Sequence, residues 1–181
     1  GLSGKTTVVS NENGKYMIYL SDRYGFNNLD SNWNSSQTEW ILIGDSFTHG
    51  EAVQTGKEIA GQIRSLTEEN VINLGMGSIG PLLEFAILKE YAESRKPKIV
   101  LWIYYEGNDL RNLKAEKSVP LLMRYLHSDF SQKLIHRQTE INNRLEKYID
   151  ESEARIQEHL LAKDKRDEFF WNTRVLRLYN I

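Results

Sequence analysis

Three largely apolar runs dominate the middle of the chain. They cover Trp40–Ile43, Val71–Leu74 and Ile99–Tyr105, and each ends at a short polar or glycine-containing segment. Apolar runs of this length, without regular alternation, are typical of strands that are buried on both faces of a parallel sheet. The pattern therefore predicts three parallel strands over these residues.

The segments between the runs have the spacing of helices. Thr55 and Glu58 match a capping box, which places a helix start just after them. The face of that helix would consist of Ile59, Ile63 and Leu66. Pro81 suits the first turn of a second helix, which Pro97 would end. The order β-α-β-α-β favours right-handed crossovers and an α/β fold with a doubly wound parallel sheet.

The N-terminal residues 1–38 form a lead-in to this core of 39–111. Thr7–Val9 and 16–20 are short runs with β propensity, and the polar residues 11–14 between them indicate a turn. The following residues, up to Gln37, are rich in Asn, Ser and Asp, which is typical of a loop.

The remaining residues, 112–181, read as a helical extension. We predict one long amphipathic helix from about 131 to about 161, followed by a charged break over Lys163–Glu168. Its buried side would carry Ile141, Leu145, Tyr148, Ile149, Ile156 and Leu160. Because so charged a helix is marginal alone, this stripe must pack on the domain or on a second copy of the chain.

Composition excludes several classes of function. The 23 basic and 25 acidic side chains nearly balance and form no basic stripe, so we expect no nucleic-acid partner. The absence of cysteine excludes disulfides and thiolate metal sites, and no histidine spacing suggests a metal, so no metal or cofactor is expected. No apolar run approaches the roughly 20 residues of a membrane span. The start Gly1–Gly4 does not resemble a natural N-terminus, which leaves room for an upstream signal or anchor.

Candidate chemistry gathers where the three predicted strands end, the edge at which α/β proteins bind ligands. The first signal is the segment Gly44–Gly50, which contains Asp45 and Ser46. A serine on a strand-to-helix turn can present its hydroxyl to a substrate. The alternative is that Asp45 and Ser46 only cap the next helix.

Two further signals follow the second and third strands. Gly75, Gly77 and Gly80 give a loop whose backbone N–H groups can face a ligand oxygen, helped by the dipole of a helix that begins near Pro81. After the third strand, the Asn108 amide can donate a hydrogen bond to a developing oxyanion. Alone, the Gly75–Gly80 segment reads as an ordinary glycine-rich turn, and Asn108 or Asp109 as a helix N-cap.

Taken together and in order, the three segments resemble the first three sequence blocks of the SGNH (GDSL-type) hydrolase superfamily. The resemblance covers about residues 22–111, and Asp22–Asn28 is similar to a lead-in of bacterial members. It implies a flavodoxin-like fold with the first strand in the middle of the sheet. It also implies Ser46 as the nucleophile. The oxyanion hole would consist of the Ser46 N–H, a backbone N–H from Gly77 or Ser78, and the Asn108 side chain. Asp45 and Asp109 would support these turns.

The chain departs from the family in two places. Ser78 stands where the family usually has glycine, and the Asp-x-x-His that carries the catalytic base is absent from the 181 residues. The histidines are His49, His127, His136 and His159. The last three read as helix residues, and His49 lies one turn beyond Ser46, where the side chain points along the helix. The simplest interpretation is a truncated domain that is nearly inactive alone.

The resemblance implies a serine esterase that removes an O-acyl group, such as acetyl, from a carbohydrate. One alternative is an O-acyltransferase that uses the same serine on a polysaccharide. Another is a non-catalytic binding or assembly module with a degenerate site. We expect a small-molecule or carbohydrate ester as partner, self-association through the 131–161 helix, and a secreted or periplasmic location rather than a cytoplasmic one.

Overall fold

The computed structural model describes the backbone of residues 1–9, 14–35 and 38–178, and their side chains except those of 164 and 166–178. Contacts divide the chain into two compact units, Gly1–Ile141 and Asn142–Ile181. The boundary expected between 111 and 112 falls inside the first unit. The helices other than the last are η1 (Asp30–Trp33), α1 (Ser46–His49), α2 (Ile59–Thr67), α3 (Pro81–Tyr91), η2 (Glu93–Arg95), α4 (Asp109–Glu116), α5 (Pro120–Met123), η3 (Arg124–Leu126) and η4 (Leu134–His136).

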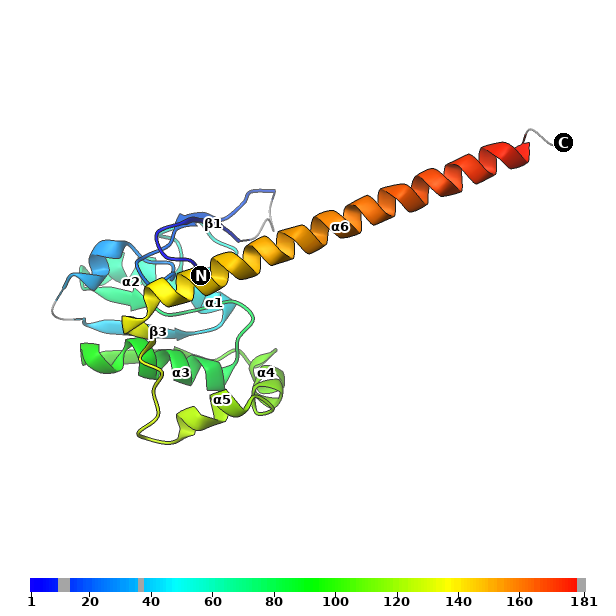
Figure 1. The fold of residues 1–181 in the computed structure, drawn as a ribbon. Coiled ribbons are helices and arrows are strands. Elements are labelled where there is room, and N and C mark those ends of the chain that lie inside the picture. Colours follow the sequence, from blue (N-terminus) through cyan, green and yellow to red (C-terminus); the bar gives the residue numbers. More distant parts are fainter. Residues whose placement is uncertain (10–13, 36–37, 179–181) are drawn as a thin grey trace. The chain divides into compact units, whose positions relative to one another are not determined.

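A three-stranded parallel sheet forms the centre of the first unit (Figure 1). Its strands are β3 (Trp40–Gly44), β4 (Val71–Asn73) and β5 (Ile99–Ile103), in the order β4-β3-β5. Trp40 is in register with Val71 on one side and with Ile99 on the other. The predicted α/β class, the three strands, their parallel direction and the central place of the first are therefore confirmed.

The two faces of the sheet bury separate apolar clusters. Ile41 and Ile43 of β3 lie in one cluster with Ile87 and Tyr91 of α3. Leu42, which points to the other face, packs with Ala60 of α2. Helices α2 and α3 therefore cover opposite faces (Figure 1), as the alternation of side chains along a strand requires.

The predicted start of α2 is confirmed, because the helix begins at Ile59, directly after Glu58. The predicted capping box was wrong, and so was the predicted face except at Ile63, which packs near Leu42. Thr55 makes no cap, because its hydroxyl donates to the Ile18 carbonyl instead, and no side chain caps this helix. Leu66 is 82% exposed, and the residues that α2 buries are Ala60 and Gly61. Small residues sit closest to the sheet there, so the periodicity of the large apolar residues was misleading.

The edges of the sheet differ, and the prediction of full burial fails at β5. Residues Ile99–Trp102 remain 36–44% exposed, and no described strand pairs with the edge of β5 that faces away from β3. At the opposite edge, Asn28 takes the place of a neighbouring strand. Its side chain accepts a hydrogen bond from Asn73 N–H at 2.8 Å and donates one to Asn73 C=O at 2.9 Å. The sheet is therefore closed at β4 and open at β5.

The lead-in also pairs as a hairpin. Strands β1 (Thr6–Val8) and β2 (Ile18–Leu20) are antiparallel, with Thr7 opposite Tyr19. The two predicted β-prone runs are therefore confirmed, while most of the predicted turn, 11–13, lies outside the described residues. The segment after β2 is irregular except for η1, in agreement with the predicted loop.

The last helix, α6, spans Gln138–Leu178 and does not begin near 131 as predicted. Glu90 of α3 explains the late start. Its carboxylate accepts the backbone N–H groups of Gln132 and Leu134, at 2.5 and 2.7 Å, and thereby holds 131–136 out of a regular helix. The backbone also stays helical through Lys163–Glu168, so the predicted break was wrong. The stretch 138–178 contains neither Gly nor Pro, the residues that end helices.

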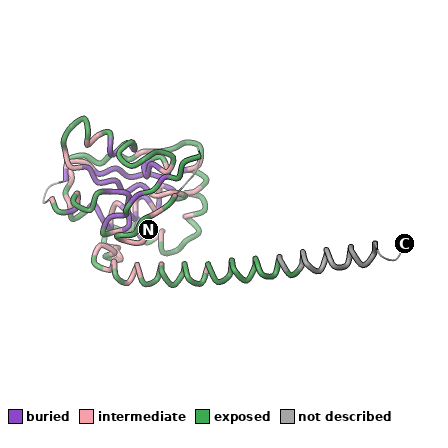
Figure 2. Tube along the Cα trace, turned by 90° about the horizontal axis from the view of Figure 1, so that it is seen from above, coloured by how far each residue is buried: buried purple, intermediate pink, exposed green. Residues whose placement is uncertain are grey.

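Several apolar residues of helix α6 are exposed in the single chain. Tyr148, Ile149, Ile156 and Leu160 are all exposed, in contrast to the buried residues of the first unit (Figure 2). No helix in the described part of the chain has the length and apolar character that a membrane span requires.

Candidate active site

Ser46 is the first residue of α1, directly after the central strand. Asp45 caps this short helix, because its Oδ1 accepts a hydrogen bond from the Phe47 N–H at 3.0 Å. Ser46 is half-buried and lines a cavity of about 310 Å³ together with Phe47, Gly50 and Glu51. The turn thus places Ser46 at the wall of a space in which a small ligand fits.

The third predicted segment meets the first. Asn108 Nδ2 donates to Asp45 Oδ2 at 3.2 Å, so the amide lies next to the residue that precedes Ser46. Asp109 is buried, and its Oδ2 accepts the Tyr105 N–H at 2.6 Å, which closes the turn after β5. Residues 63 positions apart in sequence are therefore brought together at the carboxyl ends of β3 and β5.

The second predicted segment lies beside the same turn. The Met76 N–H donates to the Gly44 carbonyl at 3.1 Å. Ser78 has φ +63°, a left-handed conformation that favours glycine, so the backbone keeps the shape that glycine would give. Within the described residues, the N–H groups of Gly77 and Ser78 donate no hydrogen bond. They remain open to an oxygen supplied by a ligand.

The start of α3 does not serve a ligand, contrary to the prediction. The Glu116 carboxylate from α4 accepts the N–H groups of Gly80 at 2.7 Å and Leu82 at 3.0 Å. A carboxylate of the chain itself thus satisfies the positive end of this helix. Only the Gly77–Ser78 part of the loop is left for ligand binding.

His49 is buried and turned toward the β1–β2 hairpin. A hydrogen bond of 3.1 Å joins its Nε2 to the Tyr19 hydroxyl, and its Nδ1 lies 3.8 Å from Glu51 Oε1. Burial lowers the pKa of His49 from 6.5 to about 4. The low pKa makes the imidazole a weak base, and its Nε2 is occupied by Tyr19; both argue against its acting as the base for Ser46.

The other histidines lie on elements other than the Ser46 turn. His127 follows η3 and His136 ends η4, on segments that pack on α3, while His159 is on α6. In the part of the chain that the structure describes, no group of three histidine or carboxylate side chains is placed to hold a metal ion.

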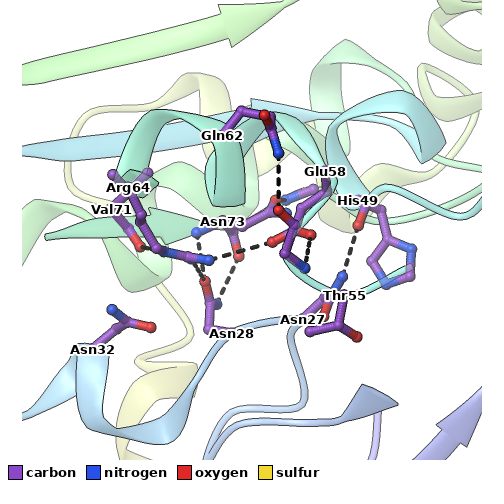
Figure 3. Close-up of polar contacts among 12 residues, drawn as sticks. Asn27, Asn28, Asn32, His49, Thr55, Glu58, Gln62, Arg64, Val71 and Asn73 are labelled. Atoms are coloured by element: carbon purple, nitrogen blue, oxygen red, sulfur yellow. Dashed lines mark hydrogen bonds and ion pairs between the residues drawn. The ribbon is translucent and has the colours of Figure 1, made fainter. Parts of the chain in front are cut away.

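A buried polar network joins the lead-in to α1 and α2 (Figure 3). Asp22 Oδ2 accepts hydrogen bonds from Asn28 Nδ2 and from Trp33 Nε1, at 2.8 and 2.7 Å. Asn73 Nδ2 then donates to the Thr48 carbonyl of α1 at 2.9 Å. The lead-in is thereby connected to the helix that begins with Ser46.

A second branch of the network anchors the same helix. Asn27 Nδ2 donates to the His49 carbonyl at 3.0 Å. Arg64 of α2 donates to Asn28 Oδ1 at 2.8 Å, and pairs with the buried Glu58 at 3.3 Å (Figure 3). Sequence reasoning did not single out Asn73, Arg64 or Glu58 as supports. Their only signal is polar character at positions that flank predicted strands and helices.

Glu84 of α3 is a fully buried carboxyl beside this site. Its Oε2 accepts the Trp102 Nε1–H at 2.6 Å, while its Oε1 is buried without a hydrogen bond. Burial raises the pKa of Glu84 to about 7, and the negative charges of Asp109, Asp45 and Glu116 add to that shift. A protonated Glu84 removes one negative charge from the underside of the Asn108 turn.

The raised pKa of Glu84 predicts a pH dependence of stability. The folded chain keeps a proton that the unfolded chain releases, so the free energy of unfolding should fall as pH rises from 4.5 to about 7. The loss is at most about 3 kcal/mol. The lowered pKa of His49 has the opposite effect: it makes the free energy of unfolding rise as pH rises from about 4 to 6.5. Wild type alone is therefore a poor test of the Glu84 contribution. Urea unfolding of wild type and Glu84→Gln at about pH 4.5 and about pH 8 isolates the Glu84 contribution. The variant should gain relative to wild type at the higher pH, and an unchanged difference would refute the assignment.

No protein-family model matches this chain, and neither a curated protein nor a solved structure does. The residues of the site are therefore the basis for its proposed function.

Proposed function

We propose that this chain is the nucleophile-bearing part of an SGNH-type serine esterase with a doubly wound sheet, and that Ser46 attacks an O-acyl group on a carbohydrate. The observation that carries the proposal is the contact between Asn108 and Asp45 at 3.2 Å. It joins the two turns that hold the proposed nucleophile and a proposed oxyanion donor. The open N–H groups of Gly77 and Ser78 supply further donors beside them.

The reaction is acyl transfer to water. Ser46 Oγ bonds to the ester carbonyl carbon and loses its proton to a base, while the carbonyl oxygen becomes an oxyanion that the N–H donors stabilise. The oxyanion then expels the sugar oxygen, which takes the proton and leaves as a hydroxyl group. Water attacks the acyl-serine in the second half and releases the carboxylic acid. Asn108 must turn its amide from Asp45 toward the oxyanion to take part.

The residues that the structure describes include no histidine placed to act as the base for Ser46. His49 is buried against Tyr19, and no described histidine contacts Ser46. Loss of the histidine from a serine-protease triad costs roughly 10⁶ in turnover. The 181-residue chain should therefore turn over 4-nitrophenyl acetate at close to the background rate.

The test of the proposal is acetylation of Ser46, with imidazole added to the buffer as an external base. Mass spectrometry after exposure to 4-nitrophenyl acetate should find acetyl-Ser46, formed faster with imidazole than without. Asn108→Ala should slow this step by about 100-fold, the effect of removing one oxyanion donor. His49→Ala is the control and should still acetylate at Ser46. An acetylation rate that changes neither with imidazole nor in Asn108→Ala would contradict the proposal. Turnover that is lost only in His49→Ala would identify His49 as the base.

A second candidate is a binding module that has the fold without catalysis. It is favoured by the engagement of His49 with Tyr19 in the buried interior. This candidate predicts binding of an acylated sugar with no acetyl-Ser46 under any condition.

A further inference from the structure

Two exposed aromatic rings stand beside Ser46. Phe47, the next residue, is 56% exposed, and Tyr105, after β5, is 42% exposed. Their ring centroids are 4.5 Å apart and their planes are inclined by 46°. The two rings come from two different turns of the site and form one apolar surface that faces solvent.

Gly107 fixes where Tyr105 lies. The tyrosine ring lies directly over the Gly107 backbone, so that a Cβ at residue 107 would come within 2.6 Å of the ring atom Cζ. The ring is thereby held next to Asn108, and through Phe47 next to Ser46. An aromatic surface in this position would meet any group attached to an acyl chain that reaches Ser46.

The cavity beside Ser46 adds polar groups to this surface. Phe47 forms part of its lining, together with the charged residues Glu51 and Lys57. Glu51 also lies against Gly77, because a Cβ there would overlap Glu51 Oε1. An apolar face bordered by a few polar groups is the arrangement by which pockets fix the orientation of a ligand.

We infer that the Phe47–Tyr105 surface and Glu51 form a subsite for the pyranose ring of an acylated sugar. The inference rests on the proposed function, since it places the acyl carbonyl at Ser46. One C–H face of the pyranose ring stacks on the aromatic surface, and the Glu51 carboxylate accepts hydrogen bonds from ring hydroxyls. Phe47 and Tyr105 thus select the alcohol part of the ester.

A cationic alcohol, such as choline, is the other ligand that aromatic rings and a carboxylate can bind. The structure favours the sugar for two reasons. The two rings present an open surface and do not enclose a cation. Lys57 lines the same cavity, and its ammonium group repels a positive ligand.

The experiment measures binding, which does not require the missing base. Methyl 6-O-acetyl-glucopyranoside is titrated into the 181-residue chain and followed by saturation-transfer and chemical-shift NMR. Tyr105→Ala and Phe47→Ala should each weaken the affinity about tenfold, and Glu51→Gln about fivefold. Gly107→Ala should act like Tyr105→Ala by displacing the ring. Tyr104→Ala is the matched control. Tyr104 is an equally exposed tyrosine one residue earlier, and the control should change the affinity by no more than about twofold.

The outcomes separate this inference from the proposed esterase activity. Sugar binding that depends on Tyr105, without any acetyl-Ser46, supports the subsite and speaks against the esterase. If the simple ester gives acetyl-Ser46 but no sugar binds up to the solubility limit, the subsite is refuted and the esterase proposal is supported. Tighter binding of acetylcholine than of the sugar also overturns it, as does equal loss of affinity in Tyr104→Ala and Tyr105→Ala.

Discussion

Asp22→Ala should lower the free energy of unfolding by about 4 kcal/mol, close to a thousandfold change in the folding equilibrium. The Asp22 side chain is fully buried and accepts four hydrogen bonds. The donors are the Tyr24 and Phe26 N–H groups and the side chains of Asn28 and Trp33, all at 2.7–2.9 Å. Alanine would leave these donors buried without an acceptor, and each such group is costly.

Urea unfolding followed by circular dichroism measures this loss. Asp30→Ala is the matched control, because Asp30 is an exposed aspartate whose ion pair with Arg23 is 2.7 Å long. Exposed pairs of this kind contribute at most about 1 kcal/mol. If the two variants lost the same stability, the buried network would not be what holds the lead-in to the sheet.

Self-association through α6 is the second large effect that we expect. Ile141, Leu145, Tyr148, Ile149, Ile156 and Leu160 fall within an arc of about 120° at 100° per residue. Four of the six are exposed in a single chain. Exposure of such an apolar stripe to water is unfavourable, so the stripe is expected to pack on another surface. A second copy of α6 would cover the stripe.

The charge pattern favours an antiparallel pair. Residues 138–161 carry six acidic and three basic side chains, whereas residues 162–178 carry three acidic and five basic ones. An antiparallel arrangement places each acidic half beside a basic half, while a parallel one places like charges together.

Sedimentation equilibrium provides the measurement. Wild type should sediment as a dimer, and Ile149→Gln combined with Ile156→Gln should be monomeric. The control, Lys147→Gln with Glu158→Gln, changes the opposite face of the helix without changing net charge, and should remain dimeric. A monomeric wild type would refute the expectation, as would equal dissociation of the two double variants.

The sequence pattern predicts some elements of the fold and not others. The three strands could be predicted because an apolar run that ends at a glycine or polar turn has few other structures open to it. The start of α6 could not, since it is set by Glu90, whose carboxylate holds residues more than 40 positions away. The burial of β5 was misjudged for a related reason. Its apolar run predicts a covered strand, but no strand in the described chain pairs with its outer edge.

In the candidate site, too, some residues could be predicted from the sequence and others could not. The proximity of Ser46, Asn108 and the Gly77–Ser78 turn could be predicted from their position after strands, because parallel strands bring their carboxyl ends to one edge. The supports beneath them were not found. Asn73 and Arg64 act through side chains that reach across the fold, and such contacts have no fixed spacing in the sequence.

Asn28 has a consequence for how copies of this molecule can assemble. A sheet with two free edges can pair with a neighbour on each side, and such pairing propagates into filaments. By occupying the backbone groups of Asn73, the Asn28 amide leaves this sheet only the β5 edge for pairing. Strand pairing through this sheet then stops at two molecules. The Asn28 side chain therefore blocks strand pairing at the β4 edge and limits edge-to-edge polymerisation, in addition to supporting the Ser46 turn.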